Sequence, residues 1–409
     1  MPLNLPWVGE SQFDRVAQTR LYCYGSSLKD LDLFRTKLTS DRRCKDGDYL
    51  LAERDGLDVG TLTSLSLKMH LHGEAFDCQG IAWVGTVKTH RRGGSGGEKG
   101  IASQVMNEGI RRARERGEAI SSLMPFRASF YEHFGYGFAE KRTEWTLPMA
   151  VCPTGDFDGL RFMRKEDQTA MGECRNRVAR AGQCDIERST DGWHQHLATF
   201  AEPMFVVDRP TDDGPVHGWL AISVESRDGK SIARIVDREH DSIDALKRQL
   251  HFLASLKDQH SVATIHLPGD LPLNLILRET QLPHRLVEHA ATSMRPYTRM
   301  QIRILDFKKV IEGIHWPKDA TGKIGIAIKE CEGTIVRLTI DVSDGRASVS
   351  TGSGDEVECS DVHFAEIISG YISASEARKL GLIKCINGES LKLLDSLSQG
   401  PAPFCMEYF

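Results

Sequence analysis

A strand, a basic glycine-rich loop and an amphipathic helix follow one another directly, and this succession constrains the fold most. Residues 79–88 (QGIAWVGTVK) have the pattern of a β-strand, and the loop THRRGGSGGEKG comes next. Apolar residues then recur at helical spacing from Ile101 to Ile110, which predicts a helix over 101–116. The backbone N–H groups of such a loop and of a helix N-terminus bind anions. The sequence therefore predicts an α/β unit with a candidate anion site.

The composition of this loop is compatible with two interpretations. Arg91, Arg92 and Lys99 supply positive charges that suit phosphates. Five glycines allow close approach of the backbone to a ligand, at positions 93, 94, 96, 97 and 100. The spacings of a P-loop and of a dinucleotide fingerprint are both absent. From composition alone, the loop fits an anion site and a plain surface connection equally well.

A second segment, SFYEHFGYGF at 129–138, follows the next expected strand at 120–124. A tyrosine on a helix ahead of a Gly–aromatic turn can direct its phenol back toward the loop. A phenol has an ordinary pKa of about 10 and can serve as a general acid. The same aromatic residues also fit the hydrophobic core, so the segment alone leaves both interpretations open.

The rest of the chain divides into three α+β regions of different texture. In the first we expect further strands at 49–52 and 60–72, the latter half-buried, and helices at 27–38 and from 130 to 136. In the second we expect strands at 204–208, 218–224, 232–237 and 262–267 and a helix at 242–255. In the third we expect strands at 300–304, 323–329, 333–341 and 347–351 and helices at 306–314, 364–371 and 375–380. The second region repeats the order of the first without a glycine-rich loop, which suggests an old duplication.

Charge and composition argue against several classes of protein. With 52 basic and 57 acidic residues the net charge is −5, whereas dedicated nucleic-acid binders are usually basic. We therefore expect neither a nucleic acid nor a membrane surface as partner. No apolar stretch approaches the roughly 18 residues of a membrane span, and the first residues lack the basic region of a signal peptide. We expect a cytoplasmic protein.

Cysteine and histidine spacing gives no sign of a metal centre. The ten cysteines include no CxxC pair, so we expect reduced thiols that mostly fill the core. His70 and His72 share one face of an expected strand, but no third ligand lies nearby in the sequence. We expect no metal.

Together, the loop and the FYEHFGYG segment resemble the GNAT superfamily of N-acetyltransferases. In that family a segment Arg/Gln-x-x-Gly-x-Gly/Ala cradles the pyrophosphate of acetyl-coenzyme A. Here Gly100 and Ala102 fit its Gly-x-Ala end, but Gly97 stands at the Arg/Gln position. The basic anchor would then come from Arg91 and Arg92 or from Lys99. The resemblance implies these cofactor-binding residues: Val84, Gly85, Thr86, Arg91, Arg92, Gly97, Lys99, Gly100, Ile101 and Ala102.

The whole chain resembles the enhanced intracellular survival (Eis-like) acetyltransferases. The resemblance rests on THRR, on FYEHFGYG, on a second region without the loop and on an apolar tail ending in Phe409. It implies an α+β chain of tandem GNAT-like domains with central mixed sheets and a C-terminal sterol-carrier-protein-like domain. The expected limits are 1–148 for the domain that binds acetyl-coenzyme A, 149–297 for a degenerate GNAT-like domain and 298–409 for the third.

The same resemblance implies an acid and a base at the reaction centre. Tyr131 matches the general acid that protonates the sulfur of coenzyme A, and the terminal carboxylate of Phe409 matches the general base. An α-carboxylate ordinarily titrates at about 3.5, so it needs desolvation, a water relay or a purely electrostatic role. The backbone at Val84 and Thr86 matches the strand that holds the pantetheine arm. A β-bulge there would splay the strands and direct a main-chain N–H at the thioester.

The leading prediction is an acetyl-coenzyme A-dependent N-acetyltransferase that acts on primary amines, either aminoglycoside-like amines or lysine side chains. We expect direct transfer in a ternary complex, because no nucleophile with an adjacent base is apparent. The alternative is a carrier of lipids or other hydrophobic ligands with degenerate acetyltransferase domains, which the departure at Gly97 keeps open. By resemblance, we expect a homohexamer.

Overall fold

The structure is a computed structural model. It describes residues 3–44, 47–91, 100–199, 203–227, 229–277, 279–281, 290–352, 354 and 356–409. The chain separates into two compact units. Unit 1 comprises Met1–Ala139, Met300–Gly400 and Tyr408–Phe409, and unit 2 comprises Glu140–Arg299 and Pro401–Glu407. Each unit is described by itself below.

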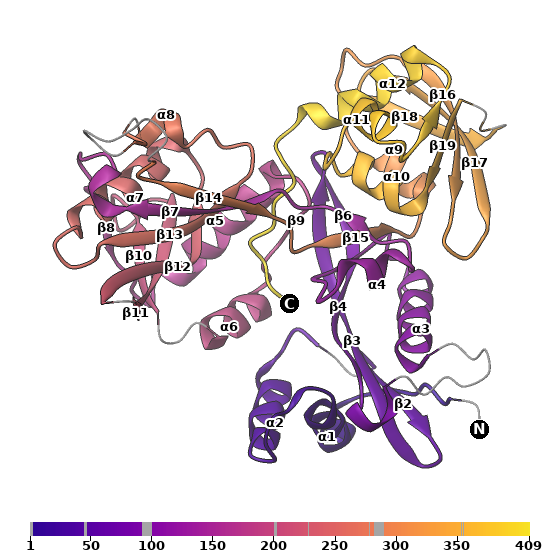
Figure 1. Ribbon diagram of the computed structural model, residues 1–409, viewed down its shortest axis with the longest axis horizontal. Coiled ribbons are helices and arrows are strands. Elements are labelled where there is room, and N and C mark those ends of the chain that lie inside the picture. Colours follow the sequence, from indigo (N-terminus) through magenta and orange to yellow (C-terminus); the bar gives the residue numbers. More distant parts are fainter. Residues whose placement is uncertain are drawn as a thin grey trace. The chain divides into compact units, whose positions relative to one another are not determined.

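The first sheet of unit 1 has the strand order β1-β2-β3-β4-β5-β15-β6 (Figure 1). Its strands are β1 (Trp7–Val8), β2 (Tyr49–Arg54), β3 (Leu57–Leu71), β4 (Glu74–Thr86), β5 (Ile120–Leu123), β6 (Gly137–Phe138) and β15 (Gln301–Ile304). β3 and β4 form a long antiparallel hairpin, whereas β5 runs parallel to β4. β15 pairs antiparallel with both β5 and β6, so a strand from far along the chain completes this sheet.

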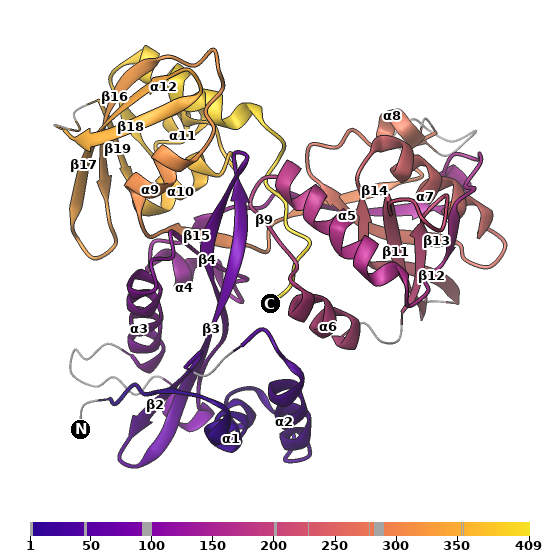
Figure 2. The same ribbon diagram turned by 180° about the vertical axis from the view of Figure 1, so that it is seen from behind.

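Helices cover both faces of this sheet (Figures 1 and 2). One face packs against α3 (Ile101–Glu115) and α4 (Ala128–Glu132) through a core that includes Ile81, Val105 and Met106. The other face packs against α1 (Phe13–Tyr24) and α2 (Asp30–Ser40) through a core that includes Val16, Phe34 and Leu51. Two short 3₁₀ turns, η1 (Glu10–Gln12) and η2 (Lys88–His90), complete this part.

A second sheet of unit 1 has the order β18-β17-β16-β19-β20. Its strands are β16 (Gly322–Lys329), β17 (Ile335–Ser343), β18 (Arg346–Thr351), β19 (Val357–Ser360) and β20 (Lys384–Cys385), with helices α9 (Phe307–Gly313), α10 (Asp361–Ile368), α11 (Ala374–Lys379), α12 (Gly388–Asp395) and η4 (Ser396–Gln399). Side chains cap several of these helices: Ser360 accepts the N–H of His363. α10 packs on β6, where the N–H of Phe138 donates to Glu366 Oε1 at 3.3 Å.

Unit 2 contains one sheet of order β14-β7-β13-β12-β11-β10-β8. Its elements are β7 (Arg142–Pro148), η3 (Met149–Val151), β8 (Leu160–Phe162), α5 (Asp167–Ala181), β9 (Asp185–Ile186), α6 (Thr190–Thr199), β10 (Met204–Asp208), β11 (Gly218–Arg227), β12 (Lys230–His240), α7 (Ile243–Ser255), β13 (Val262–Pro268), α8 (Asn274–Leu277) and β14 (Ser293–Tyr297). As in the first sheet, an antiparallel pair (β11 and β12) is followed by a parallel strand (β13).

Most expected elements are confirmed to within a few residues, but three predictions need correction. α1 is missing from the prediction because its buried face includes the polar residues Thr19 and Arg20, which interrupt the apolar pattern. The helix expected to run from 130 to 136 ends at Glu132, and the chain then turns at Gly135, whose φ is +76°. The half-buried pattern expected for β3 is wrong for Val59–Leu65, where every residue is buried between the two helical layers, whereas Ser66 and Lys68 are exposed. The predicted domain limits remain a prediction.

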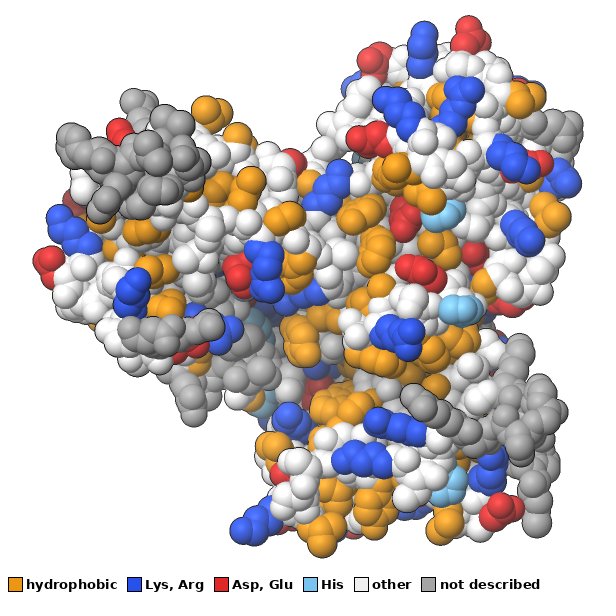
Figure 3. Space-filling view, viewed as in Figure 1, with side chains coloured by type: hydrophobic (Ala, Val, Ile, Leu, Met, Phe, Trp, Pro, Cys, Tyr) orange, Lys and Arg blue, Asp and Glu red, His pale blue; other side chains and the backbone are white. Residues whose placement is uncertain are grey.

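The ten cysteines are all free thiols, and eight of them are buried, as expected for core residues. On the face shown in Figure 3, basic and acidic side chains are scattered among one another. Within the part of the chain that the structure describes, no helix has the length and apolar character needed to cross a membrane.

Candidate active site

Strand β4 contains a β-bulge at the place where the resemblance predicts one. Ala82 lies opposite Thr63 and Gly85 lies opposite Thr61, so Trp83 and Val84 together face the single residue Leu62. Trp83 has a φ of +55°, which is uncommon for a side chain of this size. A bulge of this kind bends a strand and changes the direction in which its groups point. The predicted bulge is therefore confirmed.

The packing of Trp83 explains how this conformation is maintained. Its indole contacts the rings of Tyr24 and Phe34 edge-on, at centroid distances of 5.6 and 5.9 Å. The guanidinium of Arg20 lies 4.5 Å from the centre of the same indole. The bulge thus directs a large side chain into the layer of α1 and α2.

Beyond the parallel segment, β4 and β5 separate. Their pairing extends from Cys78–Ile120 to Ile81–Leu123, whereas β4 continues its pairing with β3 as far as Thr86. Among the described strands, none pairs with β4 on the β5 side after Ile81. The backbone groups of this segment, which includes Val84, Gly85 and Thr86, can therefore hydrogen-bond an extended ligand that carries amides.

Tyr131 lies on α4 in the core beside α3 and is 4 % exposed. Its ring contacts Phe126, Phe130 and Tyr136. Tyr131 is therefore packed as a core aromatic residue, as one of the two interpretations of the segment expects. Burial raises the pKa of the Tyr131 phenol above its ordinary value. The hydroxyl therefore remains a neutral donor at physiological pH, the state that a general acid needs.

Helix α1 contributes residues that the sequence analysis missed. A Cβ on Gly85 would lie 2.8 Å from Tyr24 Oη and 2.9 Å from Cys23 Sγ, so α1 packs tightly against the strand after the bulge. Burial raises the pKa of Tyr24, and the nearby phenol of Tyr131 adds to that shift. Burial also raises the pKa of the Cys23 thiol to about 12, which leaves it inert as a nucleophile. Gly85 is the only sequence signal for this close approach.

The ring of Phe409 also lies on β4. A Cβ on Gly80 would lie 3.0 Å from this ring, and the carbonyl oxygen of Tyr408 accepts a hydrogen bond of 3.2 Å from Arg43. Gly80 pairs with Ser122 of β5, so the Ser122 side chain shares this face of the sheet. Ser122 Oγ is buried and has no hydrogen-bond partner among the described residues. A serine inside a strand carries no sequence signal, so Ser122 was also missed.

The expected anion site is described in part. Arg92, Gly97 and Lys99 lie outside the described residues. Arg91 is exposed and donates hydrogen bonds to the carbonyl oxygens of Cys23 at 2.9 Å and Thr86 at 3.3 Å.

Gly100 occupies the N-cap of α3, where no described side chain caps the helix and no atom of the described residues lies within 4 Å of the position that a Cβ would take. Ile101 and Ala102 begin the first turn, and Ile101 is buried. The first N–H groups of α3 are thus free of side-chain caps, as an anion site requires.

Comparison with known proteins adds to this geometry. Residues 7–139 match the family described as an acetyltransferase (GNAT) domain. The matched part contains β4, α3 and Tyr131. An uncharacterized N-acetyltransferase from Streptomyces avermitilis is 23 % identical, over 92 % of this chain and 93 % of that protein.

Solved structures resemble the chain over its full length. A GCN5-related N-acetyltransferase from Anabaena variabilis has a TM-score of 0.84 at 17 % identity, with all of both chains covered. Eis1 from Mycobacterium abscessus has a TM-score of 0.77 at 16 % identity, again with both chains fully covered. The chain therefore has the mixed α/β fold of these proteins.

These findings confirm the predicted enzyme class, an N-acetyltransferase, and the resemblance to Eis-like proteins at the level of fold. The sterol-carrier-protein-like assignment of residues 298–409 and the roles of the individual site residues remain predictions.

Proposed function

We propose that this protein transfers the acetyl group of acetyl-coenzyme A to a primary amine, either on an aminoglycoside-like molecule or on a lysine side chain. The observation that carries the proposal is the bulged strand β4, which separates from β5 after Ile81. Tyr131 and the ring of Phe409 belong to the same unit as this strand.

The described residues fit acetyl-coenzyme A in two respects. The edge of β4 at Val84–Thr86, which no described strand pairs with on the β5 side, offers backbone groups to the amides of the pantetheine arm, except for the Thr86 carbonyl oxygen that accepts from Arg91. The N-terminus of α3, which no described side chain caps, suits the pyrophosphate. We assign the first contact to Val84, Gly85 and Thr86. The second is assigned to the loop and helix start: Arg91, Arg92, Gly97, Lys99, Gly100, Ile101 and Ala102. When bound, acetyl-coenzyme A supplies the thioester that the amine attacks.

Tyr131 and Phe409 supply the two proton transfers. The carboxylate of Phe409 accepts a proton from the ammonium group, which frees the nitrogen lone pair for attack on the acetyl carbon. As the new C–N bond forms and the C–S bond breaks, the Tyr131 hydroxyl gives its proton to the sulfur. The second proton lost by the nitrogen restores the phenol, and the Phe409 carboxyl releases the first one to water, so each turnover sets free one proton and both groups return to their starting state. Because the Cys23 thiol has a pKa of about 12, a covalent acyl-cysteine is not part of this scheme.

The first test measures acetyl-coenzyme A-dependent thiol release with an untagged C-terminus, using aminoglycosides, polyamines and lysine peptides as acceptors. Tyr131→Phe should lower kcat by about 100-fold or more, the usual contribution of a general acid, and leave acetyl-coenzyme A binding by calorimetry unchanged. Tyr136→Phe is the matched control, because Tyr136 is fully buried and its hydroxyl bonds Ser121 at 2.7 Å. Equal rates for the two variants would reject Tyr131 as the acid.

The second test addresses the terminal carboxylate. One alanine added after Phe409 should abolish turnover while acetyl-coenzyme A still binds. Phe409→Leu retains the carboxylate and should keep most of the activity. Full activity in the extended protein would reject the carboxylate as the base.

The same assay distinguishes this enzyme from the alternative function, a carrier of lipids or other hydrophobic ligands. A carrier of hydrophobic ligands would show neither thiol release nor acetyl-coenzyme A binding. We also propose a homohexamer by resemblance, and a monomer in light scattering at micromolar concentration would overturn that assignment.

A further inference from the structure

The sheet of unit 2 repeats the strand separation seen at β4. β12 pairs in parallel with β13 only from Ile232–Val262 to Arg234–Thr264, and its register with β11 shifts at Val236. The strand after this bulge carries Asp237, Arg238 and Glu239, all buried. Arg238 Nε donates to the carbonyl oxygen of His266 on β13 at 2.8 Å. A side chain thus bridges the gap between these two strands.

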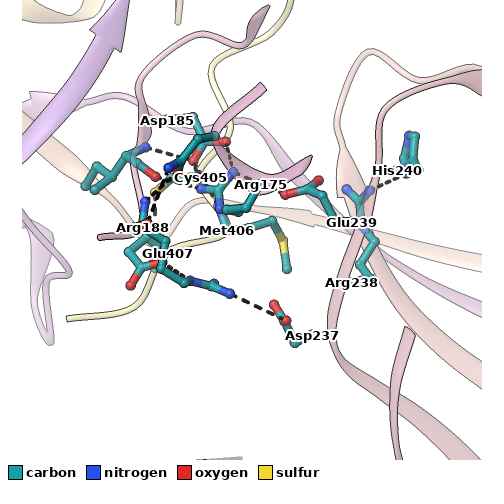
Figure 4. Close-up of polar contacts among 12 residues, drawn as sticks. Arg175, Asp185, Arg188, Asp237, Arg238, Glu239, His240, Cys405, Met406 and Glu407 are labelled. Atoms are coloured by element: carbon teal, nitrogen blue, oxygen red, sulfur yellow. Dashed lines mark hydrogen bonds and ion pairs between the residues drawn. The ribbon is translucent and has the colours of Figure 1, made fainter. Parts of the chain in front are cut away.

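A buried ionic network surrounds this gap (Figure 4). Arg175 pairs with Asp185 and, at 3.1 Å, with Glu239. Asp237 accepts hydrogen bonds from Trp219 at 2.7 Å and lies 2.9 Å from His196 Nε2. Buried charges are tolerated only when they are paired in this way.

The C-terminal segment 401–407 is bound by the same network. The ring of Phe404 lies 4.4 Å from the guanidinium of Arg142 and 5.3 Å from that of Arg238. The carbonyl oxygen of Cys405 accepts hydrogen bonds from Arg142 and, at 3.0 Å, from Arg299.

The backbone of Met406, the residue after Cys405, also contacts the network, because its N–H donates to Asp185 Oδ1 at 3.3 Å.

The last residue of this segment forms an ion pair. Glu407 is 3 % exposed and accepts a hydrogen bond of 2.6 Å from Arg188 Nε. Arg188 is itself buried, its guanidinium lies 4.6 Å from the indole of Trp193, and Nη1 is 3.9 Å from Asp237. Figure 4 shows Arg188 between Glu407 and Asp237. Removal of Arg188 would leave Glu407 buried without its partner.

We propose that Arg188 is a positioning residue, which acts through Glu407 to fix the register of the tail and hence the place of the terminal carboxylate. The inference rests on the proposed function of that carboxylate as the base. Phe409 follows Glu407 by two residues, a reach of at most about 7 Å, so little slack separates the anchor from the carboxylate. A slip of one residue would displace the carboxylate by about 3.3 Å, whereas an error of about 1 Å can cost 100-fold in rate.

The test compares Glu407→Gln with Asp208→Asn. Asp208 is a fully buried carboxylate of unit 2 that pairs with Arg248 at 2.8 Å and, among the described residues, forms no hydrogen bond or ion pair with 401–407. Glu407→Gln should lower kcat by about 100-fold with an unchanged KM for acetyl-coenzyme A. It should also speed the removal of Phe409 by carboxypeptidase A, followed by intact mass. Asp208→Asn should do neither.

Each outcome decides the proposal. Equal kcat and equal release of Phe409 in the two variants would overturn the positioning role. If Glu407→Gln fails to fold, the double variant Arg188→Met/Glu407→Met removes both charges and should show the same loss of kcat and the same faster release of Phe409. A wild-type protein that acetylates no amine would overturn the proposed function instead, and release of Phe409 would still report whether Glu407 anchors the tail.

Discussion

The first sheet of unit 1 and the sheet of unit 2 share a backbone irregularity but use it differently. In each, an antiparallel pair contains a bulge and the next parallel strand then separates from the bulged one. After the bulge, β4 carries Val84, Gly85 and Thr86, which leave its backbone edge available. β12 carries Asp237, Arg238 and Glu239, whose side chains occupy the gap. The side chains that follow the bulge thus decide whether the gap beside the strand suits the proposed ligand site or is filled by a buried ionic network.

The helix after each bulged strand shows the same contrast. α3 begins after Gly100 with no cap from the side chains that the structure describes, whereas Ser242 caps α7 by accepting the N–H of Ala245 at 3.2 Å. The first N–H groups of α7 are therefore partly used within the protein, whereas no described side chain uses those of α3, where the pyrophosphate site is proposed. Both differences favour unit 1 as the place of the predicted acetyl-coenzyme A site.

The largest loss of stability is expected from a substitution in the ionic network that fills the gap in unit 2. Arg175→Met would leave Asp185 and Glu239 buried without their common partner, and should lower the free energy of unfolding by about 3–5 kcal/mol. Urea unfolding followed by circular dichroism measures this loss. Arg180→Met is the control on the same helix, since Arg180 is mostly exposed and pairs with Glu187 at the surface. It should cost less than about 1 kcal/mol. A similar cost for both variants would show that the network is not an integral part of the core.

The next effect tests whether β4 needs a glycine where α1 approaches. Gly85→Ala places a Cβ 2.8 Å from Tyr24 Oη, and should cost about 1–3 kcal/mol of stability by overpacking. Thiol release should fall as well, because the added methyl group would displace the backbone of β4, the strand assigned to the pantetheine arm. Gly388→Ala is the control, because no atom of the described residues lies within 4 Å of its Cβ position. It starts α12 and should be neutral or slightly stabilising. Unchanged stability in Gly85→Ala would mean that α1 does not pack tightly on β4.

Much of the fold could be predicted from the sequence because its signals are local. The strand–loop–helix order, the helix over 101–116 and the strand at 204–208 follow from periodicity within short windows. The bulge in β4 has no such signal and was expected only through the family resemblance.

What the sequence could not predict depends on contacts between distant residues. Glu407 and its partner Arg188 are 219 positions apart, and neither has a neighbourhood that marks it as paired. Tyr24 and Ser122 join the candidate site only because α1 and β5 lie beside β4 in the folded chain. Buried charges on β12 look like an ordinary solvated face until their partners are known.

The smallest effect is expected when the N-cap residues of α3 and α7 are exchanged, with serine placed at 100 and glycine at 242. Gly100→Ser adds a capping hydroxyl to α3 at a residue whose φ of −59° suits any side chain, and should stabilise the protein by about 0.5 kcal/mol. The same hydroxyl competes with phosphate for the first N–H groups, so the affinity for acetyl-coenzyme A should fall by about fivefold, the equivalent of one hydrogen bond of about 1 kcal/mol. Ser242→Gly removes the cap of α7 and should cost a few tenths of a kcal/mol, about 0.3, with no change in that affinity. Calorimetry on both variants measures the contrast. An unchanged affinity in Gly100→Ser would show that the N-terminus of α3 is not the pyrophosphate site, and a loss in Ser242→Gly would show that the second helix also binds the ligand.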